Sequence, residues 1–232
     1  MNSIHPTAQI IGNVSLGSGN TIGALVVIIG PVTMGDGNWI GTGSVIGAPP
    51  EVRSWEHPSE AFNPSSGSGI IIGNKNVVRE YAQIHQGWHD QTRIGNDGFI
   101  MNQCYVAHDC VVEDGATLAS SVLLGGHVRI GAGANLGLGT SVHQRRYVGA
   151  GAMVGMGSVV TRNVPPFAKA YGNPARVVSV NSVGMVRAGI PTATISAIES
   201  AYRVTLEESL TGLDGLDGFT DALAEWRTHA QS

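Results

Sequence analysis

An aliphatic residue recurs at every sixth position over most of the chain. The first run of this hexad pattern covers residues 4–46, and a short second run covers residues 72–84. After a shift of four residues, the pattern continues without a break over residues 94–160. A six-residue period of this kind, often with glycine after the aliphatic residue, is the sequence signature of a parallel β-helix built from hexapeptides.

In this fold, each coil has three short flat faces, and one hexad forms each face. The aliphatic residue and the residue four positions later point inward, so the second position should be small. The residues that fit this position are Ala8, Val14, Val26, Val32, Ser44, Ala82, Ala116, Ala134, Ala152 and Ser158. A coil buries its apolar side chains only when it is stacked on neighbours. We therefore predict an all-β, left-handed parallel β-helix over residues 1–172, an exception to the usual right-handed crossover.

Two interruptions of the pattern predict loops. The first, at about residues 49–70, contains Pro49-Pro50 and a run of serine and glycine, so it should protrude from the helix. The second lies near residues 89–93 and adds four residues. Loops on a solenoid often build functional sites, but they also occur as neutral insertions. Both interpretations remain open for each loop.

The hexad pattern ends at Val164-Pro165-Pro166, and a helical period follows it. We predict helices over residues 180–188, 193–206 and 219–228, and hence a small α-helical C-terminal domain over residues 173–232. Such a tail can cover the exposed end of a solenoid. It can also contact a substrate.

The composition excludes several classes of protein. The chain of 232 residues is 42% hydrophobic and 13% charged, which is typical of a globular protein. Its net charge of −4 argues against a general nucleic-acid binder. The longest aliphatic run, residues 24–29, is too short to cross a membrane, and no signal peptide precedes the repeat. We therefore expect a cytoplasmic protein. Cys104 and Cys110 occupy inward small positions, and we expect both to be buried thiols that do not bind zinc.

Histidines gather on one of the three predicted faces. Hexads that begin at residues 84, 106, 124, 142 and 160 should stack, because eighteen residues make one coil and the four extra residues loop out. The histidines on these hexads are His85, His108, His127 and His143. An isolated histidine is usually a surface residue without a role, but a column of four rarely arises by chance. Histidine suits proton transfer near neutral pH, and the backbone at Gly125-Gly126 could donate to an oxyanion.

Arginines follow the same hexads. Arg129, Arg145 and Arg162 belong to the hexads at 124, 142 and 160, and Arg146 is adjacent. They either are solvated surface charges or bind an anionic ligand, such as nucleotide phosphates or an acidic carrier protein. Arg146 occupies a nominally inward position, where an unpaired charge would be costly. We therefore expect a local distortion or a paired partner there.

Several segments resemble the UDP-N-acetylglucosamine O-acyltransferases of lipid A synthesis. The resemblance covers nearly the whole chain and weakens after Leu206. The segments are Val106-Ala107-His108-Asp109-Cys110, Gly125-Gly126-His127-Val128, Val142-His143-Gln144, Val164-Pro165-Pro166, Gly172-Asn173, Val180-Asn181, Gly184-Met185-Val186-Arg187-Ala188-Gly189, Ala197-Ile198 and Ala201-Tyr202. The hexads are common to hexapeptide acyltransferases, whereas the histidine segments and the tail are specific to this family.

The resemblance implies a role for each of these residues. His108 would be the general base, Asp109 would orient it, and the N–H of Gly126 would hold the oxyanion. The substrate-binding residues would be His85, His127, His143, Gln144, Asn181 and Arg187. The donor would be a hydroxyacyl thioester on acyl carrier protein, and the acceptor a UDP-N-acetylglucosamine-like nucleotide sugar. The sites would lie between the subunits of a homotrimer, and no metal or organic cofactor would be needed.

The chain departs from the family pattern at several positions. Tyr105 stands where the family usually has histidine, and Arg187 is followed by Ala188 rather than a second basic residue. Val183 stands where an acidic residue is expected, and the first loop lacks an Asp/Lys substrate pair. These changes concern the acceptor sugar and leave its identity, and the choice between O- and N-acylation, open.

Three other functions fit parts of the sequence. A CoA-dependent acetyl- or acyltransferase acting on an amino sugar would share the fold and the histidine base. A zinc enzyme of the carbonic anhydrase type needs an HxxxxH pair, whereas His85 and His89 have the wrong spacing. A non-catalytic scaffold would not need His108, Asp109 and Gly126, all of which are present.

The acyl-chain groove yields a first prediction. Met153 matches a family methionine, and Met156 stands where the family can have glycine. Because a bulky side chain should shorten the groove, we expect ten-carbon donors to be preferred over fourteen-carbon donors. Competition between the two acyl thioesters measures this preference, and a clear preference for the fourteen-carbon donor would contradict it.

Overall fold

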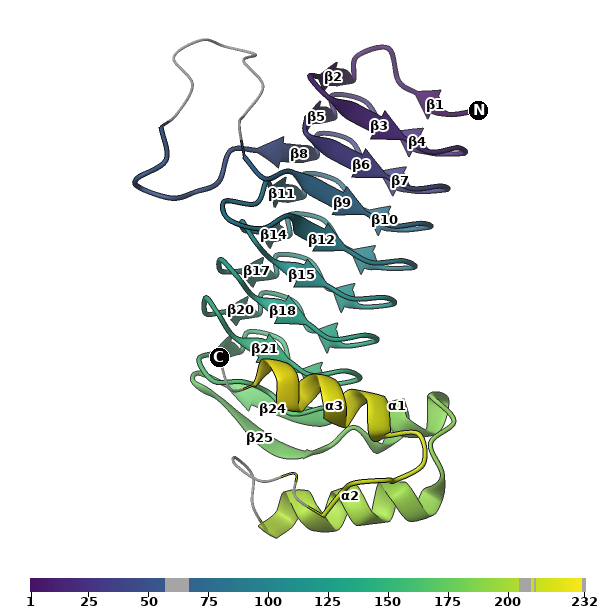
Figure 1. Ribbon diagram of the computed structural model, residues 1–232, viewed down its shortest axis with the longest axis vertical. Helices are drawn as coiled ribbons and strands as arrows, with labels where there is room; N and C mark the ends of the chain where they lie inside the picture. The colour runs from purple at the N-terminus through teal and green to yellow at the C-terminus, as the bar shows by residue number, and fades with distance from the viewer. Residues whose placement is uncertain (57–66, 205–209, 211, 231–232) are drawn as a thin grey trace.

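The strands of the protein form a parallel β-helix with three sheets (Figure 1). The computed structural model describes residues 1–56, 67–204, 210 and 212–230. Within these residues, the first sheet, sheet A, has ten strands in the order β1 (Ser3–Ile4), β4 (Thr21–Ile22), β7 (Trp39–Ile40), β10 (Val77–Val78), β13 (Phe99–Ile100), β16 (Thr117–Leu118), β19 (Asn135–Leu136), β22 (Met153–Val154), β24 (Ala168–Gly172) and β25 (Ala175–Val180).

The other two sheets complete the triangular cross-section. Over the same described residues, sheet B has eight strands: β2 (Gln9–Ile11), β5 (Val27–Ile29), β8 (Val45–Ala48), β11 (Gln83–His85), β14 (Tyr105–Val106), β17 (Leu123–Leu124), β20 (Ser141–Val142) and β23 (Val159–Val160). Sheet C has seven: β3 (Val14–Leu16), β6 (Val32–Met34), β9 (Ile70–Ile72), β12 (Thr92–Ile94), β15 (Val111–Val112), β18 (Arg129–Ile130) and β21 (Tyr147–Val148).

The register of sheet B confirms the predicted stacking of the histidine hexads. Val106 of β14 pairs with Ile84 of β11 on one side and with Leu124 of β17 on the other. Leu124 pairs in turn with Val142, which pairs with Val160. The step from 84 to 106 therefore loops out four residues, and all later steps are eighteen residues long.

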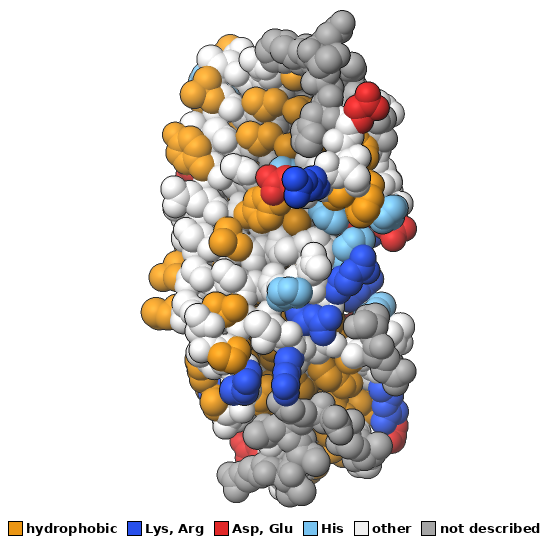
Figure 2. Space-filling model, turned by 90° about the vertical axis from the view of Figure 1, so that its left-hand side faces the viewer, with side chains coloured by type: hydrophobic (Ala, Val, Ile, Leu, Met, Phe, Trp, Pro, Cys, Tyr) orange, Lys and Arg blue, Asp and Glu red, His pale blue; other side chains and the backbone are white. Residues whose placement is uncertain are grey.

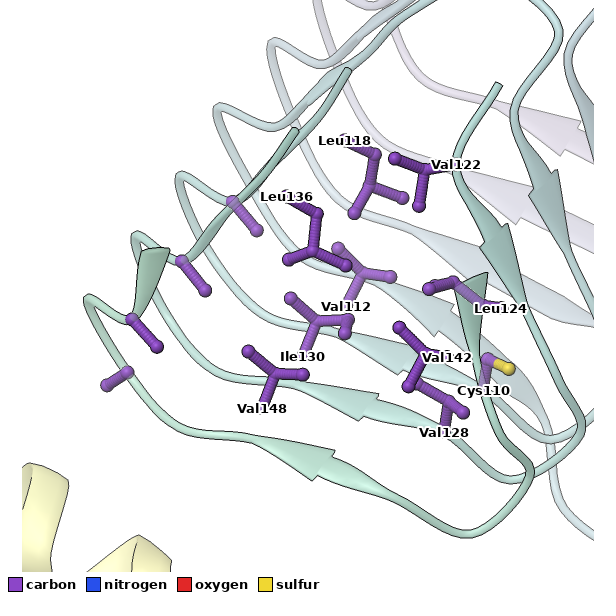
Figure 3. Packing of buried hydrophobic residues seen from close by; sticks show 14 of the residues in the cluster. Cys110, Val112, Leu118, Val122, Leu124, Val128, Ile130, Leu136, Val142 and Val148 are labelled. Carbon is purple, nitrogen blue, oxygen red and sulfur yellow. The ribbon is translucent and has the colours of Figure 1, made fainter. Parts of the chain in front are cut away.

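Aliphatic side chains from the three sheets meet along the axis of the helix. Figure 3 shows Leu118, Leu124, Ile130 and their neighbours pointing into the interior, where they are fully buried. The small inward positions complete this core. Among them are the free thiols Cys104 and Cys110, which are buried as predicted. Burial raises the pKa of Cys104 to about 11 and that of Cys110 to about 12, so both remain protonated.

The two interruptions of the hexad pattern meet on one side of the prism. Residues 49–56 leave the stack after β8 (Figure 1), and residues 57–66 lie outside the described part of the chain. The chain returns at Gly69, which forms an antiparallel bridge with Gly87 of the second interruption. The N–H of Ser68 also donates to the carbonyl oxygen of Gly87 at 2.8 Å. The end of the first loop is thus packed on the second.

The C-terminal region covers the last coil (Figure 1). It contains α1 (Ser182–Arg187), α2 (Thr192–Val204) and α3 (Thr220–His229) in the described residues, close to the predicted helices. Residues 205–206, at the predicted end of the second helix, lie outside the described part. Residues 175–180 differ from the expectation, because β25 pairs antiparallel with β24 and extends sheet A. No helix in the described part of the chain is long and apolar enough to span a membrane.

We predict that the core of the prism dominates its stability. Leu118 is fully buried, so Leu118→Ala should lower the free energy of unfolding by about 2–5 kcal/mol. Val186 is an exposed aliphatic residue, and Val186→Ala should change this energy by less than about 0.5 kcal/mol. Urea unfolding followed by circular dichroism measures both. Equal midpoints for the two variants would contradict the expected packing.

Candidate active site

His108 and Asp109 form an oriented pair in the turn after β14. The Nδ1–H of His108 donates to Oδ2 of Asp109 at 2.8 Å, which assigns the proton of the neutral ring to Nδ1. The Asp109 side chain is 1% exposed and that of His108 is 12% exposed. His108 therefore has a free lone pair on Nε2, in a ring held by a buried carboxylate, as a general base requires.

The second interruption supplies the remaining partners of Asp109. The backbone N–H groups of Trp88, His89 and Asp90 all donate to Oδ1, at 2.9, 3.0 and 2.8 Å. Burial opposes the charge on this carboxylate, but the hydrogen bonds from His108 and from the backbone outweigh it. They hold the pKa of Asp109 below its usual range. Asp109 is thus ionised at neutral pH.

The backbone of Gly126, after β17, lies directly against the ring of His108. A Cβ at this position would come within 2.5 Å of Cε1 and Nε2 of the imidazole. The N–H groups on either side of Gly126 are used by the ladder, since Gly125 donates to Val142 and His127 donates to His108. Among the described residues, no acceptor takes the N–H of Gly126 itself. This donor beside the base is therefore available to an oxyanion.

His127 completes the cluster around Asp109. Its Nε2 lies 3.6 Å from Oδ2 of Asp109, and its ring is perpendicular to that of His108 at 5.1 Å between centroids. Burial lowers the pKa of His127, although Asp109 opposes this shift, so its ring is neutral at pH 7. The ring of His89 lies 6.4 Å away, and the edge-on contact of Trp88 with His108 spans 5.9 Å. Aromatic rings thus surround the base.

One group of side chains in the described residues has the composition of a metal site. His108, Asp109 and His127 offer ligand atoms that all lie within 4.8 Å of one another. However, hydrogen bonds already occupy both oxygens of Asp109 and Nδ1 of His108. Asp109 and Nδ1 of His108 are therefore already paired, in the arrangement that proton transfer at Nε2 needs.

His85 belongs to the same column but is buried beneath the start of the first loop. Its side chain is 6% exposed, its Nδ1 lies 2.8 Å from the carbonyl oxygen of Pro49, and its Nε2 lies 3.8 Å from Glu51. Its ring packs against Tyr105 at 5.1 Å. In the single chain this side chain thus contacts the first loop, and its predicted contact with substrate stays a prediction. Tyr105 also donates to the Glu51 carboxylate, and burial together with Glu51 raises the pKa of Tyr105.

The next coil carries further predicted substrate contacts. His143, Gln144 and Arg145 are exposed in the turn after β20, and the N–H of Arg145 donates to the carbonyl oxygen of Gly126 at 2.9 Å. Arg146 is partly exposed, with Nε 3.4 Å from the Gln144 carbonyl oxygen, so its charge does not enter the core. Figure 2 shows histidines and basic side chains together on this face. Arg162 is exposed in the turn after β23.

Arg129 does not lie on the histidine face, where the sequence pattern placed it. It is the first residue of β18 in sheet C, and its Nη1 forms an ion pair with Glu113 at 2.5 Å. The reason is its place in the hexad, because the residue just before an inward aliphatic residue faces outward from the following strand. Arg129 therefore faces outward from sheet C, whereas Arg145 and Arg162 lie in turns that follow sheet B.

The predicted tail and groove residues do not meet the histidine cluster within one chain. Asn181 begins α1, where its side chain accepts from the N–H of Gly184 at 3.1 Å and donates to the Gly151 carbonyl oxygen at 3.0 Å. Figure 1 places α1, which ends at the exposed Arg187, on the side of the prism opposite to the turns after β14 and β17. Met153 and Met156 are exposed on sheet A and in the turn that follows it.

Sequence reasoning missed the turn of Trp88, His89 and Asp90 as a part of the site. The signal was present as the four-residue shift of the hexad pattern, which predicted a loop but not its contact with Asp109. The contact of Glu51 with Tyr105 was also missed, because it joins residues more than fifty positions apart.

The fold and the site together define a class. A parallel β-helix that carries a carboxylate-oriented histidine beside a free backbone N–H has the features of a hexapeptide-repeat acyltransferase. A family model described as UDP N-acetylglucosamine O-acyltransferase, domain 2, matches residues 163–229. This match and the relatives described next support the assignment of the chain to the UDP-N-acetylglucosamine O-acyltransferase family.

Individual relatives agree with this assignment. The acyl-[acyl-carrier-protein]–UDP-N-acetylglucosamine O-acyltransferase of Gloeothece citriformis is 38% identical over 171 residues, which are 73% of this chain and 59% of the relative. The protein of the same name from Burkholderia orbicola is 36% identical, over 72% of this chain and 62% of the relative. The chain thus spans about three fifths of the length of the curated relatives that it matches.

Solved structures extend the likeness over the whole chain. The UDP-N-acetylglucosamine acyltransferase of Francisella novicida has a TM-score of 0.80 at 26% identity, covering 99% of this chain and 84% of that one. The enzyme from Acinetobacter baumannii has a TM-score of 0.71 at 27% identity, covering 100% and 94%. The shared fold is the predicted left-handed β-helix with a small C-terminal helical region.

The contact between Gly126 and His108 yields a prediction. Because a Cβ at residue 126 would displace the His108 ring, Gly126→Ala should lower kcat on the order of 100-fold in an acyl-transfer assay. Gly139→Ala is the control, since a Cβ there meets nothing within 4 Å and only strains a left-handed turn. A Gly126→Ala variant with the kcat of the wild-type protein would show that this backbone does not adjoin the reacting atoms.

Proposed function

We propose that this protein is a cytoplasmic acyltransferase that moves a 3-hydroxyacyl group from acyl carrier protein to a hydroxyl of a UDP-N-acetylglucosamine-like nucleotide sugar. The observation that carries the proposal is the pair of His108 and Asp109 beside the free N–H of Gly126. The names of the relatives support the donor and the acceptor.

The reaction needs one base and one oxyanion donor. Nε2 of His108 removes the proton of the sugar hydroxyl, whose oxygen attacks the carbonyl carbon of the thioester. The N–H of Gly126 holds the oxyanion that forms, and Asp109 stabilises the protonated imidazole. The intermediate then breaks the carbon–sulfur bond, and the carrier thiolate takes the proton back from His108. No metal or organic cofactor is required, because the thioester is already activated.

The charges around the base fit an anionic substrate. His143, Gln144 and Arg145 lie one coil beyond Gly126 and are exposed, so they can bind the diphosphate of a nucleotide sugar. Arg162 lies a coil further and suits the acidic surface of a carrier protein. Arg129 is a weaker candidate, because Glu113 already neutralises its charge.

We further propose that the active protein is a homotrimer with sites between its subunits. One chain keeps Asn181, Arg187, Met153 and Met156 away from the histidine cluster, whereas a neighbouring copy could bring them to it. Exposed apolar side chains support such an association, since Leu123, Leu138 and Met156 are 46%, 49% and 75% exposed in the single chain. Figure 2 shows hydrophobic side chains along the face that carries the histidines.

The experiment that tests the function combines product analysis with one substitution. Purified protein is incubated with UDP-N-acetylglucosamine and 3-hydroxydecanoyl acyl carrier protein, and mass spectrometry identifies the product. We expect the nucleotide sugar to gain one hydroxyacyl group. His108→Gln should lower the rate on the order of 1,000-fold.

Two comparisons make the result decisive. His5→Gln, at an exposed histidine of the first coil, should leave the rate unchanged. Acetyl-CoA with amino-sugar nucleotides should give no product. Acetylation of an amino sugar without hydroxyacyl transfer, or full activity of His108→Gln, would overturn the proposal.

A further inference from the structure

We infer that the turn formed by Trp88, His89 and Asp90 positions the carboxylate of Asp109. The four extra residues of the second interruption form this turn. The inference rests on the proposed function, because it concerns the residue that orients the base. It assigns a role to backbone groups and to Gly87, which have no reactive side chains.

The hydrogen bonds at Asp109 differ from those elsewhere in the prism. Along another edge, the side chains of Asp36, Asn74, Asn96 and Asp114 each accept one backbone N–H from the preceding coil. At Asp109, three consecutive N–H groups converge on a single oxygen, and the other oxygen remains for His108. The regular edge thus provides one backbone donor per side chain, and the interruption provides three.

The geometry of the interruption explains how three donors reach one atom. Four extra residues lie between β11 and β12, and the chain doubles back at Gly87. A Cβ on Gly87 would lie 1.5 Å from the carbonyl oxygen of Asp90, so no other residue fits without opening the turn. Gly87 is not in the left-handed region, and close approach alone requires glycine here.

The end of the first loop holds the turn from behind. The N–H of Gly87 donates to Gly69 at 3.1 Å, and the N–H of Ser68 donates to Gly87 at 2.8 Å. The hydroxyl of Ser68 lies 3.2 Å from the carbonyl oxygens of both Trp88 and His89. The turn is therefore held on both sides, with its N–H groups directed at Asp109 and the carbonyl groups of Trp88 and His89 directed at Ser68.

This arrangement decides how Asp109 acts on the base. A carboxylate that is 1% exposed has lost most of its hydration, and the three donors replace the water that would otherwise stabilise its charge. They also prevent rotation of the carboxylate, so Oδ2 stays directed at Nδ1 of His108. An open turn would leave Asp109 free to rotate, and the tautomer with a lone pair on Nε2 would lose its stabilisation.

The kinetic test uses the full-length protein. Gly87→Ala should lower kcat on the order of 100-fold, because the base is misplaced, and should leave KM for the nucleotide sugar nearly unchanged. Gly73→Ala is the matched control, since its Cβ would also meet backbone, 2.5 Å from the Gly95 carbonyl oxygen, at a turn remote from the site. This control should retain the kcat of the wild-type protein.

A double-mutant comparison separates positioning from general damage. In an Asp109→Asn background, Gly87→Ala should have little further effect, because the carboxylate that it positions is gone. An equal loss in both backgrounds would overturn the inference. Ser68→Ala should lower kcat several-fold by loosening the same turn, and it serves as the readout if Gly87→Ala does not fold.

A spectroscopic test does not depend on activity. Nitrogen-15 NMR of the imidazoles, with His108 assigned by its loss in His108→Gln, reports which nitrogen carries the proton. We expect the Nδ1–H tautomer in the wild-type protein and in Gly73→Ala, and a mixture with the Nε2–H tautomer in Gly87→Ala and, less strongly, in Ser68→Ala. An unchanged Nδ1–H tautomer in both turn variants would overturn the inference. If the wild-type protein transferred no acyl group, the proposed function would fail, while this measurement would still decide the role of the turn.

Discussion

The structure depends on the fixed register of parallel strands in its three sheets. Neighbouring strands lie about 4.8 Å apart, and one coil takes eighteen residues, so equal positions of successive coils lie directly above one another. A side chain in a turn is therefore placed within a few ångströms of its counterpart in the next coil. Because of this constraint, the ring of His108 contacts the backbone of Gly126, and Gly126 contacts Arg145 of the next coil. These contacts join residues that are only about one coil apart in the sequence.

The candidate active site lies where the second interruption of the repeat packs against the regular coils. A regular prism alone would place His108 beside Gly126, but it would offer Asp109 too few partners for a buried charge. The turn after β11 adds the missing donors, and the end of the first loop holds that turn in place. The regular coils thus set the distance between His108 and Gly126. The turn after β11 stabilises the charge of Asp109 and, through it, the orientation of His108.

Much of this arrangement could be predicted from the sequence, because a strict period assigns each residue to a face. The hexad pattern predicted the β-helix, the stacking of His108, His127 and His143, and the burial of Cys104 and Cys110. It could not predict contacts that depend on chain outside the period. His85 proved to be buried because Pro49 and Glu51 fold over it, and Asn181 is engaged at the start of α1.

Other differences come from positions within a coil that the period resolves poorly. Arg129 was assigned to the histidine face, but it begins the following strand and faces Glu113. Residues 175–180 form a strand because the edge of sheet A is open there and pairs with them. The convergence of three N–H groups on Asp109 depends on the shape of one tight turn, which composition and spacing do not specify.

The most direct test of the account is the position of the acceptor relative to His108. A crystal structure of the protein with bound UDP-N-acetylglucosamine measures the distance from Nε2 of His108 to the nearest sugar hydroxyl. The account predicts a distance of about 3 Å, with the hydroxyl on the same side of the ring as the N–H of Gly126. A nucleotide sugar bound with no hydroxyl near His108 would contradict it.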